Sequence, residues 1–244
     1  MIFHTQPALV RLFLGQGLFE EVREVGHMPP PFDHHCPLMS LPAALETTID
    51  TTPYGDQPYL SALSKDVSNW SERLRGLSRP RVGVVWQGAL RESRVDLDAT
   101  GRTLNVPLRL LAIALDPPGI NFVSLQKGDP AEAELRVRET AFWQNGYLLN
   151  AAAQLNDFGD TAGLIENLDL VISVDTATAH LAAALGKPTW ILNRHDTCWR
   201  WLLRREDSPW YPSVRLYRQG ADRDWGHVLK RVANDLVLFR DSFV

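Results

Sequence analysis

The chain has 244 residues, of which 45% are hydrophobic and 22% charged, values that are ordinary for a soluble globular protein. Its formal net charge of −4 gives it no overall attraction for nucleic acid or for an anionic membrane. The sequence shows no signal peptide and no apolar run of the ~20 residues that span a bilayer, and its 2 cysteines form neither a disulfide framework nor a zinc signature. We therefore expect a cytoplasmic protein that has no membrane span and binds no nucleic acid.

The first 78 residues contain only short predicted elements, separated by loops rich in Pro, Gly, Thr and Asp. These elements are a strand at residues 2–3, a proline-initiated helix at 7–14, a strand at 21–25 and helices at 38–45 and 65–74. The region is too short for a complete Rossmann domain. We therefore predict a truncated N-terminal α/β lobe over residues 1–78, with an open sheet edge that favours self-association into a homo-oligomer.

From residue 79 onward, apolar strands and helices alternate regularly. The expected strands are 81–86, 120–125, 168–174, 189–192 and 214–217, and the expected helices are 107–115, 131–139, 161–167, 176–185 and 225–239. Near-continuous apolar strands separated by helices indicate a parallel sheet that is covered on both faces. We predict a Rossmann-like, doubly wound α/β domain over residues 79–244, with ligands at the loops that follow the strands.

Residues 170–188 join a buried strand to a short helix and carry the clearest chemical signal. Asp175 stands where a helix N-cap is expected, and Gly186, followed by a proline, stands where the helix ends. The first turn of such a helix has backbone N–H groups without intrahelical acceptors. Alternatively, Asp175 only caps the helix, as similar residues do in many α/β folds.

An anion site is predicted at the first turn of this helix. The backbone N–H groups of Thr176, Ala177 and Thr178, together with the helix dipole, favour a phosphate there. His180 lies one turn after Thr176, and helical side chains lean toward the N-terminus, so its imidazole is expected to point toward the same anion. The alternative for His180 is a core histidine whose polar atoms are satisfied within the protein.

The run Asp-Thr-x-x-x-His-x-x-x-x-x-Gly-x-Pro, which begins at Asp175, has companion motifs along the chain. These are residues 6–9, 32–38, 82–88, 122–128, 157–162 and 199–212. In this order they resemble motifs of the heptosyltransferase-like glycosyltransferases (glycosyltransferase family 9), most closely the glycosyltransferase-like domain that follows tetratricopeptide repeats in many bacterial proteins. The resemblance covers nearly the whole chain. It implies a GT-B architecture and sugar transfer from a nucleotide-diphosphate sugar to an acceptor, with no cofactor and no metal.

The resemblance also implies where the diphosphate of the donor would lie. The residues around it would be Asp175, Thr176, Ala177, Thr178 and His180. Gly88 would let the backbone approach the donor closely. Arg102 would offset phosphate charge, although its loop, residues 89–104, departs from the family pattern.

Further donor-binding roles are implied for residues of two other loops. Gln126 and Lys127, which follow the second expected strand of the domain, would face the base or the ribose. Trp199 and Trp201 would stack on the sugar or the base, because an indole ring suits such contacts. The alternative for both tryptophans is packing that pins a long loop.

No residue matches the carboxylate that serves as general base in heptosyltransferases. Asp33 and His34 are the candidate catalytic residues, in a loop that we expect to line the acceptor side of the cleft between the lobes. The adjacent Asp, His, His and Cys residues of this loop lack the spacing of metal ligands, so we expect no metal there. Three explanations stay open: the chain is a fragment, it is a short homologue without transfer activity, or Asp33 replaces the base.

The leading hypothesis is therefore a glycosyltransferase whose partners are a nucleotide-diphosphate sugar and an acceptor that the sequence does not identify. The alternative is a non-catalytic module that binds nucleotide-sugars or acts as a scaffold. A nucleotide-sugar epimerase is disfavoured, because the sequence offers no matching pair of carboxylates. The nucleotide base, the sugar and the oligomeric state are not specified by the sequence.

Overall fold

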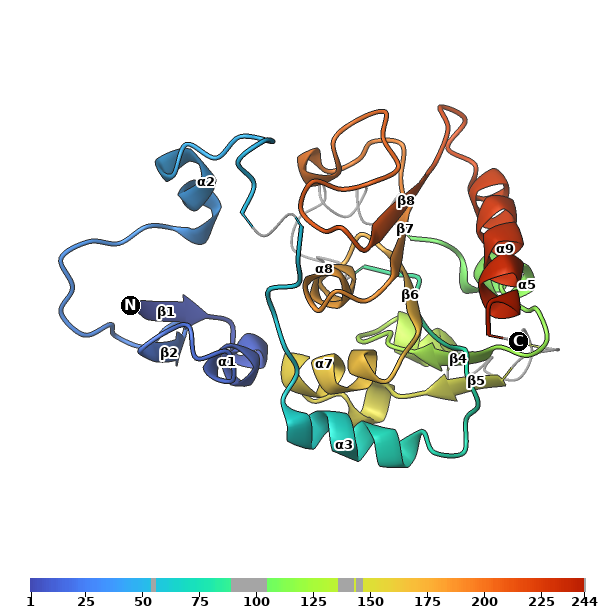
Figure 1. Ribbon diagram of the computed structural model, residues 1–244, viewed down its shortest axis with the longest axis horizontal. Helices are drawn as coiled ribbons and strands as arrows, with labels where there is room; N and C mark the ends of the chain where they lie inside the picture. The colour runs from blue at the N-terminus through green and yellow to red at the C-terminus, as the bar shows by residue number, and fades with distance from the viewer. Residues whose placement is uncertain (54–55, 89–104, 136–142, 144–146, 244) are drawn as a thin grey trace.

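The computed structural model describes residues 1–53, 56–88, 105–135, 143 and 147–243. Its centre is a six-stranded sheet in the order β5-β4-β3-β6-β7-β8, in which all neighbouring strands are parallel (Figure 1). The strands are β3 (Arg81–Val85), β4 (Asn121–Ser124), β5 (Tyr147–Asn150), β6 (Leu170–Val174), β7 (Thr189–Asn193) and β8 (Val214–Arg218). The strand order reverses between β3 and β6, as in a Rossmann-like, doubly wound sheet, so the predicted fold class is confirmed.

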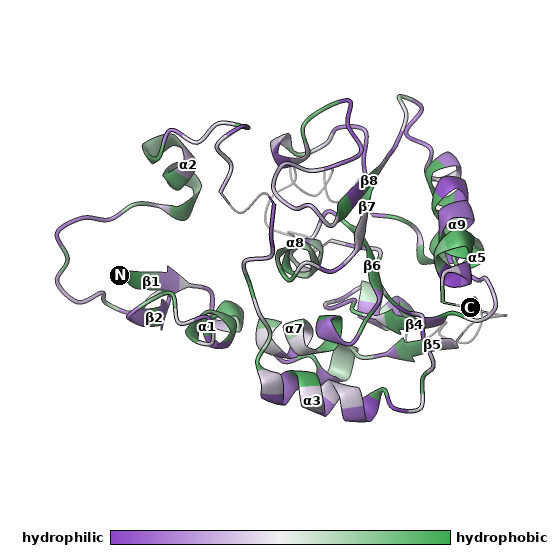
Figure 2. Cartoon of the chain, in the orientation of Figure 1, coloured by the Kyte–Doolittle hydropathy of each residue, from purple (hydrophilic) through white to green (hydrophobic). Residues whose placement is uncertain are grey.

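Helices cover both faces of this sheet. Figure 1 shows α5 (Leu108–Ala114) and α9 (Trp225–Asp241) together on one side, and α7 (Phe158–Glu166) and α8 (Ala177–Ala184) on the other. A further helix, α3 (Ser64–Arg73), packs on the outer side of α7. Burial on both faces explains why the strands are nearly continuous in hydrophobic residues (Figure 2).

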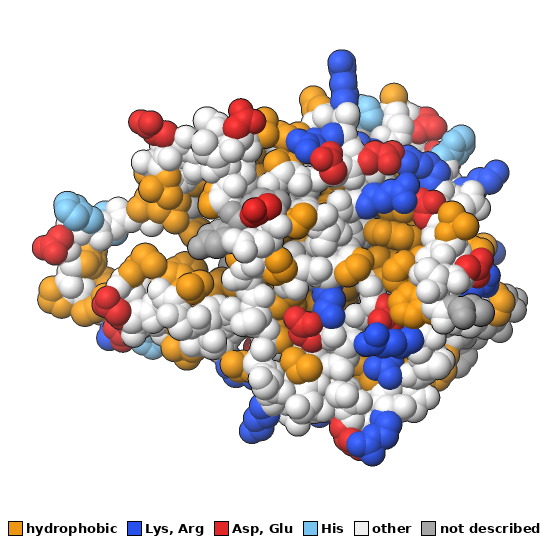
Figure 3. All heavy atoms as spheres, viewed as in Figure 1, with side chains coloured by type: hydrophobic (Ala, Val, Ile, Leu, Met, Phe, Trp, Pro, Cys, Tyr) orange, Lys and Arg blue, Asp and Glu red, His pale blue; other side chains and the backbone are white. Residues whose placement is uncertain are grey.

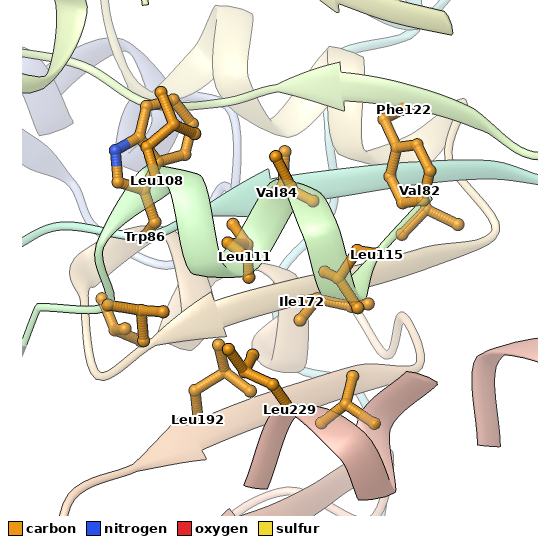
Figure 4. Close-up of a cluster of buried hydrophobic side chains, with 14 of the residues drawn as sticks. Val82, Val84, Trp86, Leu108, Leu111, Leu115, Phe122, Ile172, Leu192 and Leu229 are labelled. Carbon is orange, nitrogen blue, oxygen red and sulfur yellow. The ribbon is translucent and has the colours of Figure 1, made fainter. Parts of the chain in front are cut away.

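The core on the α5 and α9 face is made of side chains from all six strands of the sheet, from these two helices and from adjoining segments. Figure 4 shows part of this cluster. Val84 of β3, Ile172 of β6 and Leu192 of β7 lie in this cluster and are at most 1% exposed. Each such buried aliphatic side chain contributes roughly 1.5–3 kcal/mol relative to an exposed one. A second buried cluster fills the α7 and α8 face and includes side chains of α1 and α3.

The N-terminal residues form a small β-α-β unit. Strands β1 (Ile2–Thr5) and β2 (Glu21–Glu24) pair in parallel, and α1 (Pro7–Leu14) connects them. A 3-10 turn, η1 (Leu38–Ser40), leads directly into the short helix α2 (Leu41–Ala44). Figure 1 shows this unit beside the sheet domain, with α1 next to α7.

Arg11 of α1 joins this unit to two helices of the sheet domain. Its guanidinium donates to Asp66 of α3 at 2.5 Å, to both carboxylate oxygens of Asp157 at 2.7 Å and to Asp160 at 3.0 Å. Asp157 is also the N-cap of α7, where its side chain accepts from the backbone N–H of Asp160. One cation thus links α1, α3 and the start of α7.

The predicted helices and strands agree closely with the observed ones, and most of their ends differ by no more than two residues. Larger differences occur at three places. Strand β5 was not predicted. Helix α7 begins at Phe158, three residues earlier than expected, because Asp157 caps it. The expected helix at 131–139 is helical over 131–135, and its remainder lies outside the described residues.

The lobe boundary between residues 78 and 79 stays a prediction, although α3 packs with α7 of the sheet domain. None of the described helices has the length and apolar composition of a membrane span.

Candidate functional site

The strand order reverses between β3 and β6, so the loops that follow these two central strands diverge at the carboxyl ends of the strands. Gly88 follows β3, and residues 175–178 follow β6. Ligands of doubly wound sheets bind in the crevice at this point. The structure therefore places the predicted phosphate-binding segment at the carboxyl ends of the strands, where the strand order reverses.

Thr176, and not Asp175, is the N-cap of α8, which corrects the prediction by one residue. Its side chain Oγ1 accepts from the backbone N–H of Ala179 at 3.4 Å and lies 3.0 Å from the hydroxyl of Ser173. The hydroxyl of Thr176 thus caps the N-terminus of α8. As N1 and N2 of the helix, Ala177 and Thr178 have no intrahelical acceptor for their N–H groups.

Asp175 is instead a partner of His180. Its carboxylate oxygen lies 3.4 Å from Nε2 of His180. This nitrogen makes no hydrogen bond to any residue that the structure describes. Burial alone would raise the pKa of Asp175, but its interactions with His180, Trp201 and Arg200 together outweigh burial, and the pKa of this carboxyl is lowered. Asp175 is therefore an anion beside the first turn of α8.

Three aromatic side chains fix the position of the His180 ring. The indole of Trp201 stacks on it, with ring centroids 4.9 Å apart and planes inclined by 14°. The hydroxyl of Tyr211 lies 3.0 Å from Nδ1 of His180, and the hydroxyl of Tyr59 donates to Tyr211 at 3.3 Å. The imidazole is therefore held among Asp175, Trp201 and Tyr211, whereas the prediction had it pointing toward a bound anion.

Tyr59 and Tyr211 were not singled out in the sequence. Tyr211 lies 31 residues from His180, and Tyr59 lies 152 residues from Tyr211, so no local spacing relates them. Burial raises the pKa of both tyrosines, so their hydroxyls stay protonated near neutral pH. The aromatic run Trp-Tyr-Pro around Tyr211 is the one signal that could have drawn attention to it.

Gln126 holds the ends of β3 and β4 together. Its side chain is 3% exposed, and its carbonyl oxygen accepts from the backbone N–H groups of Trp86 and Gln87 at 3.1 and 3.0 Å. Its amide nitrogen donates to the carbonyls of Gln87 and Lys127. Both amide atoms are thus bonded to the backbone, so Gln126 shapes this edge, and its predicted contact with a base or ribose stays a prediction.

The other predicted residues of these loops are placed as follows. Lys127 donates to the carbonyl of Ala152 at 2.7 Å, which connects the ends of β4 and β5. The backbone N–H of Gly88 donates to the side chain of Asn105 at 3.0 Å. Arg102 lies outside the described residues.

The two tryptophans of the aromatic loop have different surroundings. Trp201 is fully buried, so for this residue the alternative of packing is correct. Trp199 is 56% exposed, and its ring lies near Trp210 and beneath the guanidinium of Arg200. Together with Tyr211, these three residues face α2 and the turn before it across a cavity of about 150 Å³. Trp199 is therefore accessible to a ligand, and Trp201 is not.

Asp33 and His34 are exposed in the segment between β2 and η1. Figure 1 shows this segment at the outer edge of the molecule, on the far side of the N-terminal unit from α8. The structure does not bring these residues to the predicted donor site, so their catalytic role stays a prediction. Among the residues that the structure describes, no three His, Cys, Asp or Glu side chains are placed to hold a metal ion.

A known protein family is similar in sequence to the segment that contains the start of α8. Residues 111–195 match the sequence model of glycosyltransferase family 9 (heptosyltransferase), a stretch that runs from α5 to the end of β7 and includes the start of α8. Among individual relatives, the chain is 34% identical over 181 residues to Protein FlbA of Caulobacter vibrioides. That alignment covers 72% of this chain and 28% of FlbA.

Two solved structures share the fold. The glycosyl transferase family 9 structure from Veillonella parvula has 14% identity and a TM-score of 0.50, covering 85% of this chain and 54% of that one. The E. coli ADP-heptose lps heptosyltransferase II has 19% identity and a TM-score of 0.52, covering 76% of this chain and 55% of that one. The chain thus spans about half the length of these structures.

Proposed function

We propose that the chain carries the donor-binding domain of a GT-B glycosyltransferase and binds a nucleotide-diphosphate sugar at the start of α8. The observation that carries this proposal is the position of α8: its first turn lies at the reversal point of the sheet, within the segment that matches glycosyltransferase family 9. Helix N-termini at such points bind phosphates through free N–H groups and the helix dipole.

In this proposal, the N–H groups of Ala177 and Thr178 donate to the diphosphate. During transfer, the bond between sugar and diphosphate breaks and negative charge grows on the leaving diphosphate, which fixed donors stabilise. Asp175 is itself an anion at this position, with Nε2 of His180 lying 3.4 Å from its carboxylate. Trp199 offers an exposed indole for a ring of the donor or acceptor.

A non-catalytic nucleotide-sugar-binding module remains the second candidate. It is favoured by the position of Asp33 and His34, which the structure leaves away from α8. Purified protein that transfers or hydrolyses a nucleotide-sugar would exclude this candidate. The association with tetratricopeptide repeats, a homo-oligomeric state and a cytoplasmic location are further proposals that rest on the sequence alone.

The test uses a backbone donor that can be removed without disturbing the helix. Ala177→Pro deletes one N–H at N1, a position where proline is well tolerated, and Thr176 already has the extended backbone that precedes a proline. Ser64→Pro is the matched control, because Ser64 is an exposed N1 residue of α3 that follows an extended Leu63.

Thermal stability is measured with UDP, GDP and ADP and their sugars. A nucleotide at 100 times its Kd stabilises the folded state by about 2.7 kcal/mol, which raises Tm by several degrees. We expect a shift with one base in the wild type and in Ser64→Pro, and binding weakened about tenfold in Ala177→Pro, because a hydrogen bond to a charged group is lost. No shift with any nucleotide would overturn the donor-site proposal.

A further inference from the structure

A line of four polar side chains leads from the segment before α3 to the start of α8. The hydroxyl of Tyr59 donates to the hydroxyl of Tyr211 at 3.3 Å, and the Tyr211 hydroxyl lies 3.0 Å from Nδ1 of His180. On the other side of the imidazole ring, Nε2 lies 3.4 Å from the carboxylate of Asp175. The line therefore ends beside the proposed donor site.

The first hydrogen bond of this line determines where the other protons lie. Each tyrosine hydroxyl has one hydrogen, and burial raises the pKa of Tyr59 and Tyr211, so both keep it near neutral pH. Because the Tyr211 oxygen accepts from Tyr59, its own hydrogen is left for Nδ1 of His180. An Nδ1 that accepts a hydrogen bond carries no proton, so the proton of the imidazole ring is on Nε2, which faces Asp175.

Packing keeps the imidazole ring in this orientation. Trp201, which is fully buried, stacks on His180 with ring centroids 4.9 Å apart. The next residue, Leu202, has a φ of +52°, a conformation that residues other than glycine seldom adopt. Arg218 donates to the carbonyl of Trp201 and holds this turn. Strained backbone of this kind persists where the surrounding structure fixes it, and it clusters at functional sites.

The backbone of Tyr59 is fixed against α8. Its N–H donates to the carbonyl of Ala184, at the end of α8, at 3.0 Å. Gly186 leaves room for the preceding Pro58, because a Cβ atom at the glycine would lie 2.5 Å from Cγ of the proline. This segment therefore lies along α8 and brings the Tyr59 hydroxyl to Tyr211.

We propose that Tyr59 and Tyr211 are positioning residues of the donor site. They hold His180 in the tautomer that carries its proton on Nε2, and this N–H orients the carboxylate of Asp175. Nε2 is buried and has no hydrogen-bond acceptor among the described residues, which is unfavourable for an N–H group. Hydrogen bonds at functional sites often tighten when the ligand binds, so we expect Nε2–H to donate to Asp175 in the complex.

The carboxylate of Asp175 then has one oxygen beside His180 and one left for the ligand. Its side chain is 13% exposed, and a carboxylate only accepts hydrogen bonds. It therefore suits a hydroxyl group of the bound nucleotide-sugar and not a phosphate oxygen. This role of Asp175 rests on the proposed function, whereas the tautomer of His180 does not.

Nitrogen-15 NMR of the histidine-labelled whole chain tests the tautomer. At pH 7 we expect Nδ1 of His180 without a proton and Nε2 with one, the signals being identified by their absence in His180→Gln. Tyr211→Phe should shift the Nδ1 signal, because its hydrogen bond is lost, and Tyr59→Phe should shift it less. Tyr217→Phe is the matched control, since its hydroxyl bonds Asp235. A protonated Nδ1, or an unshifted signal in Tyr211→Phe, would overturn the proposal.

Calorimetric titration with UDP-glucose, GDP-glucose and ADP-glucose, and with the free diphosphates, tests the positioning role. Tyr211→Phe should weaken the nucleotide-sugar that the wild type binds by about threefold to tenfold. In Asp175→Asn the same substitution should have no further effect, because no carboxylate is left to orient.

The outcomes separate this proposal from the donor-site proposal. A loss for the nucleotide-sugar alone would place the hydroxyl on the sugar, and an equal loss for the free diphosphate would place it on the ribose. Unchanged affinity in Tyr211→Phe, or equal losses with and without Asp175→Asn, would overturn the positioning role. A wild type that binds no nucleotide would refute the donor site, and the NMR signals would still decide the tautomer.

Discussion

At the scale of single residues, His180 is held by three different kinds of contact. Its ring stacks on buried Trp201, its Nδ1 lies 3.0 Å from the hydroxyl of Tyr211, and its Nε2 faces Asp175. These contacts set the direction of the imidazole and keep one anion beside the first turn of α8. The Tyr211 hydroxyl should therefore contribute to stability through His180.

A double-mutant cycle tests this coupling. We expect Tyr211→Phe to lower the free energy of unfolding by about 1–2 kcal/mol, because Nδ1 of His180 loses its hydrogen-bond partner. In His180→Ala the same substitution should cost about 0.5–1.5 kcal/mol less, since the partner is already gone. Urea unfolding of the four proteins gives these values. Tyr217→Phe is the control: its hydroxyl bonds Asp235, so its effect should add to that of His180→Ala, and additivity for Tyr211→Phe as well would contradict the coupling.

The same residues show which features of the site could be predicted from the sequence and which could not. Spacing along one strand and helix drew attention to Asp175, Thr176 and His180, although it put the N-cap of α8 at Asp175 rather than at Thr176. It could not give the direction of the imidazole, because Trp201 and Tyr211 come from a different loop. Nor could it separate exposed Trp199 from buried Trp201, two residues apart in one aromatic segment, since only packing distinguishes them.

At the scale of elements, the contact between α3 and α7 depends on a glycine. A Cβ atom added at Gly163 would lie 2.6 Å from Cβ of Asp66 and 2.8 Å from its backbone carbon. Glycine lowers helix stability by about 1 kcal/mol relative to alanine, so its presence inside α7 needs a reason. Close approach of α3 is that reason, and it also brings Asp66 to Arg11.

Gly163→Ala should therefore destabilise the protein by about 1–3 kcal/mol despite the better helix propensity of alanine, because the added carbon forces the two helices apart. The measurement is the urea midpoint of unfolding. Gly76→Ala is the matched control, since no atom lies within 4 Å of the added Cβ and its φ is not in the left-handed range. Gly163→Ala that is as stable as Gly76→Ala would show that the helices do not need this close approach.

Strands were predictable from the sequence where their pattern of apolar residues was strong, and were not predictable where it was weak. Strands β3 and β6 consist almost entirely of buried apolar residues, so their sequences identify them. Strand β5 is Tyr-Leu-Leu-Asn, which lacks β-branched residues, and only its pairing with β4 at the edge of the sheet makes it a strand. Such an edge strand depends on its neighbour more than on its own composition.

At the scale of the whole molecule, the N-terminal unit is attached to the sheet domain by buried side chains of α1 and by polar contacts. Arg11 links α1 to α3 and α7, and the N–H groups of Tyr59 and Leu60 donate to the carbonyl of Ala184 at the end of α8. Large hydrophobic side chains of this unit stay exposed, among them Met28, Met39 and Leu45, and Figure 3 shows hydrophobic side chains gathered on it. The sequence predicted both parts, but not this attachment, because Arg11 and Asp157 are 146 residues apart.

The attachment through Arg11 makes stability depend on pH. Hydrogen bonds from Arg11 lower the pKa of Asp157 below its ordinary value, so the ionised carboxylate stabilises the folded state. A lowered folded-state pKa gives stability that is present above the unfolded value, about 3.9, and is lost as pH falls through the folded value. The same contacts raise the pKa of Arg11, so the guanidinium stays charged throughout.

Arg11→Gln should therefore cost about 2 kcal/mol of unfolding free energy at pH 7, because three carboxylates lose their shared cation and repel one another. This cost should shrink below about pH 4, where protonation relieves the repulsion in the variant and removes the ion pair from the wild type. Urea unfolding at pH 7 and at acidic pH measures both effects. Arg23→Gln is the control, since Arg23 pairs locally with Glu21 and such surface pairs contribute at most about 1 kcal/mol. An equal cost for the two variants, or a cost for Arg11→Gln that does not change with pH, would mean that another contact holds the N-terminal unit to the sheet domain.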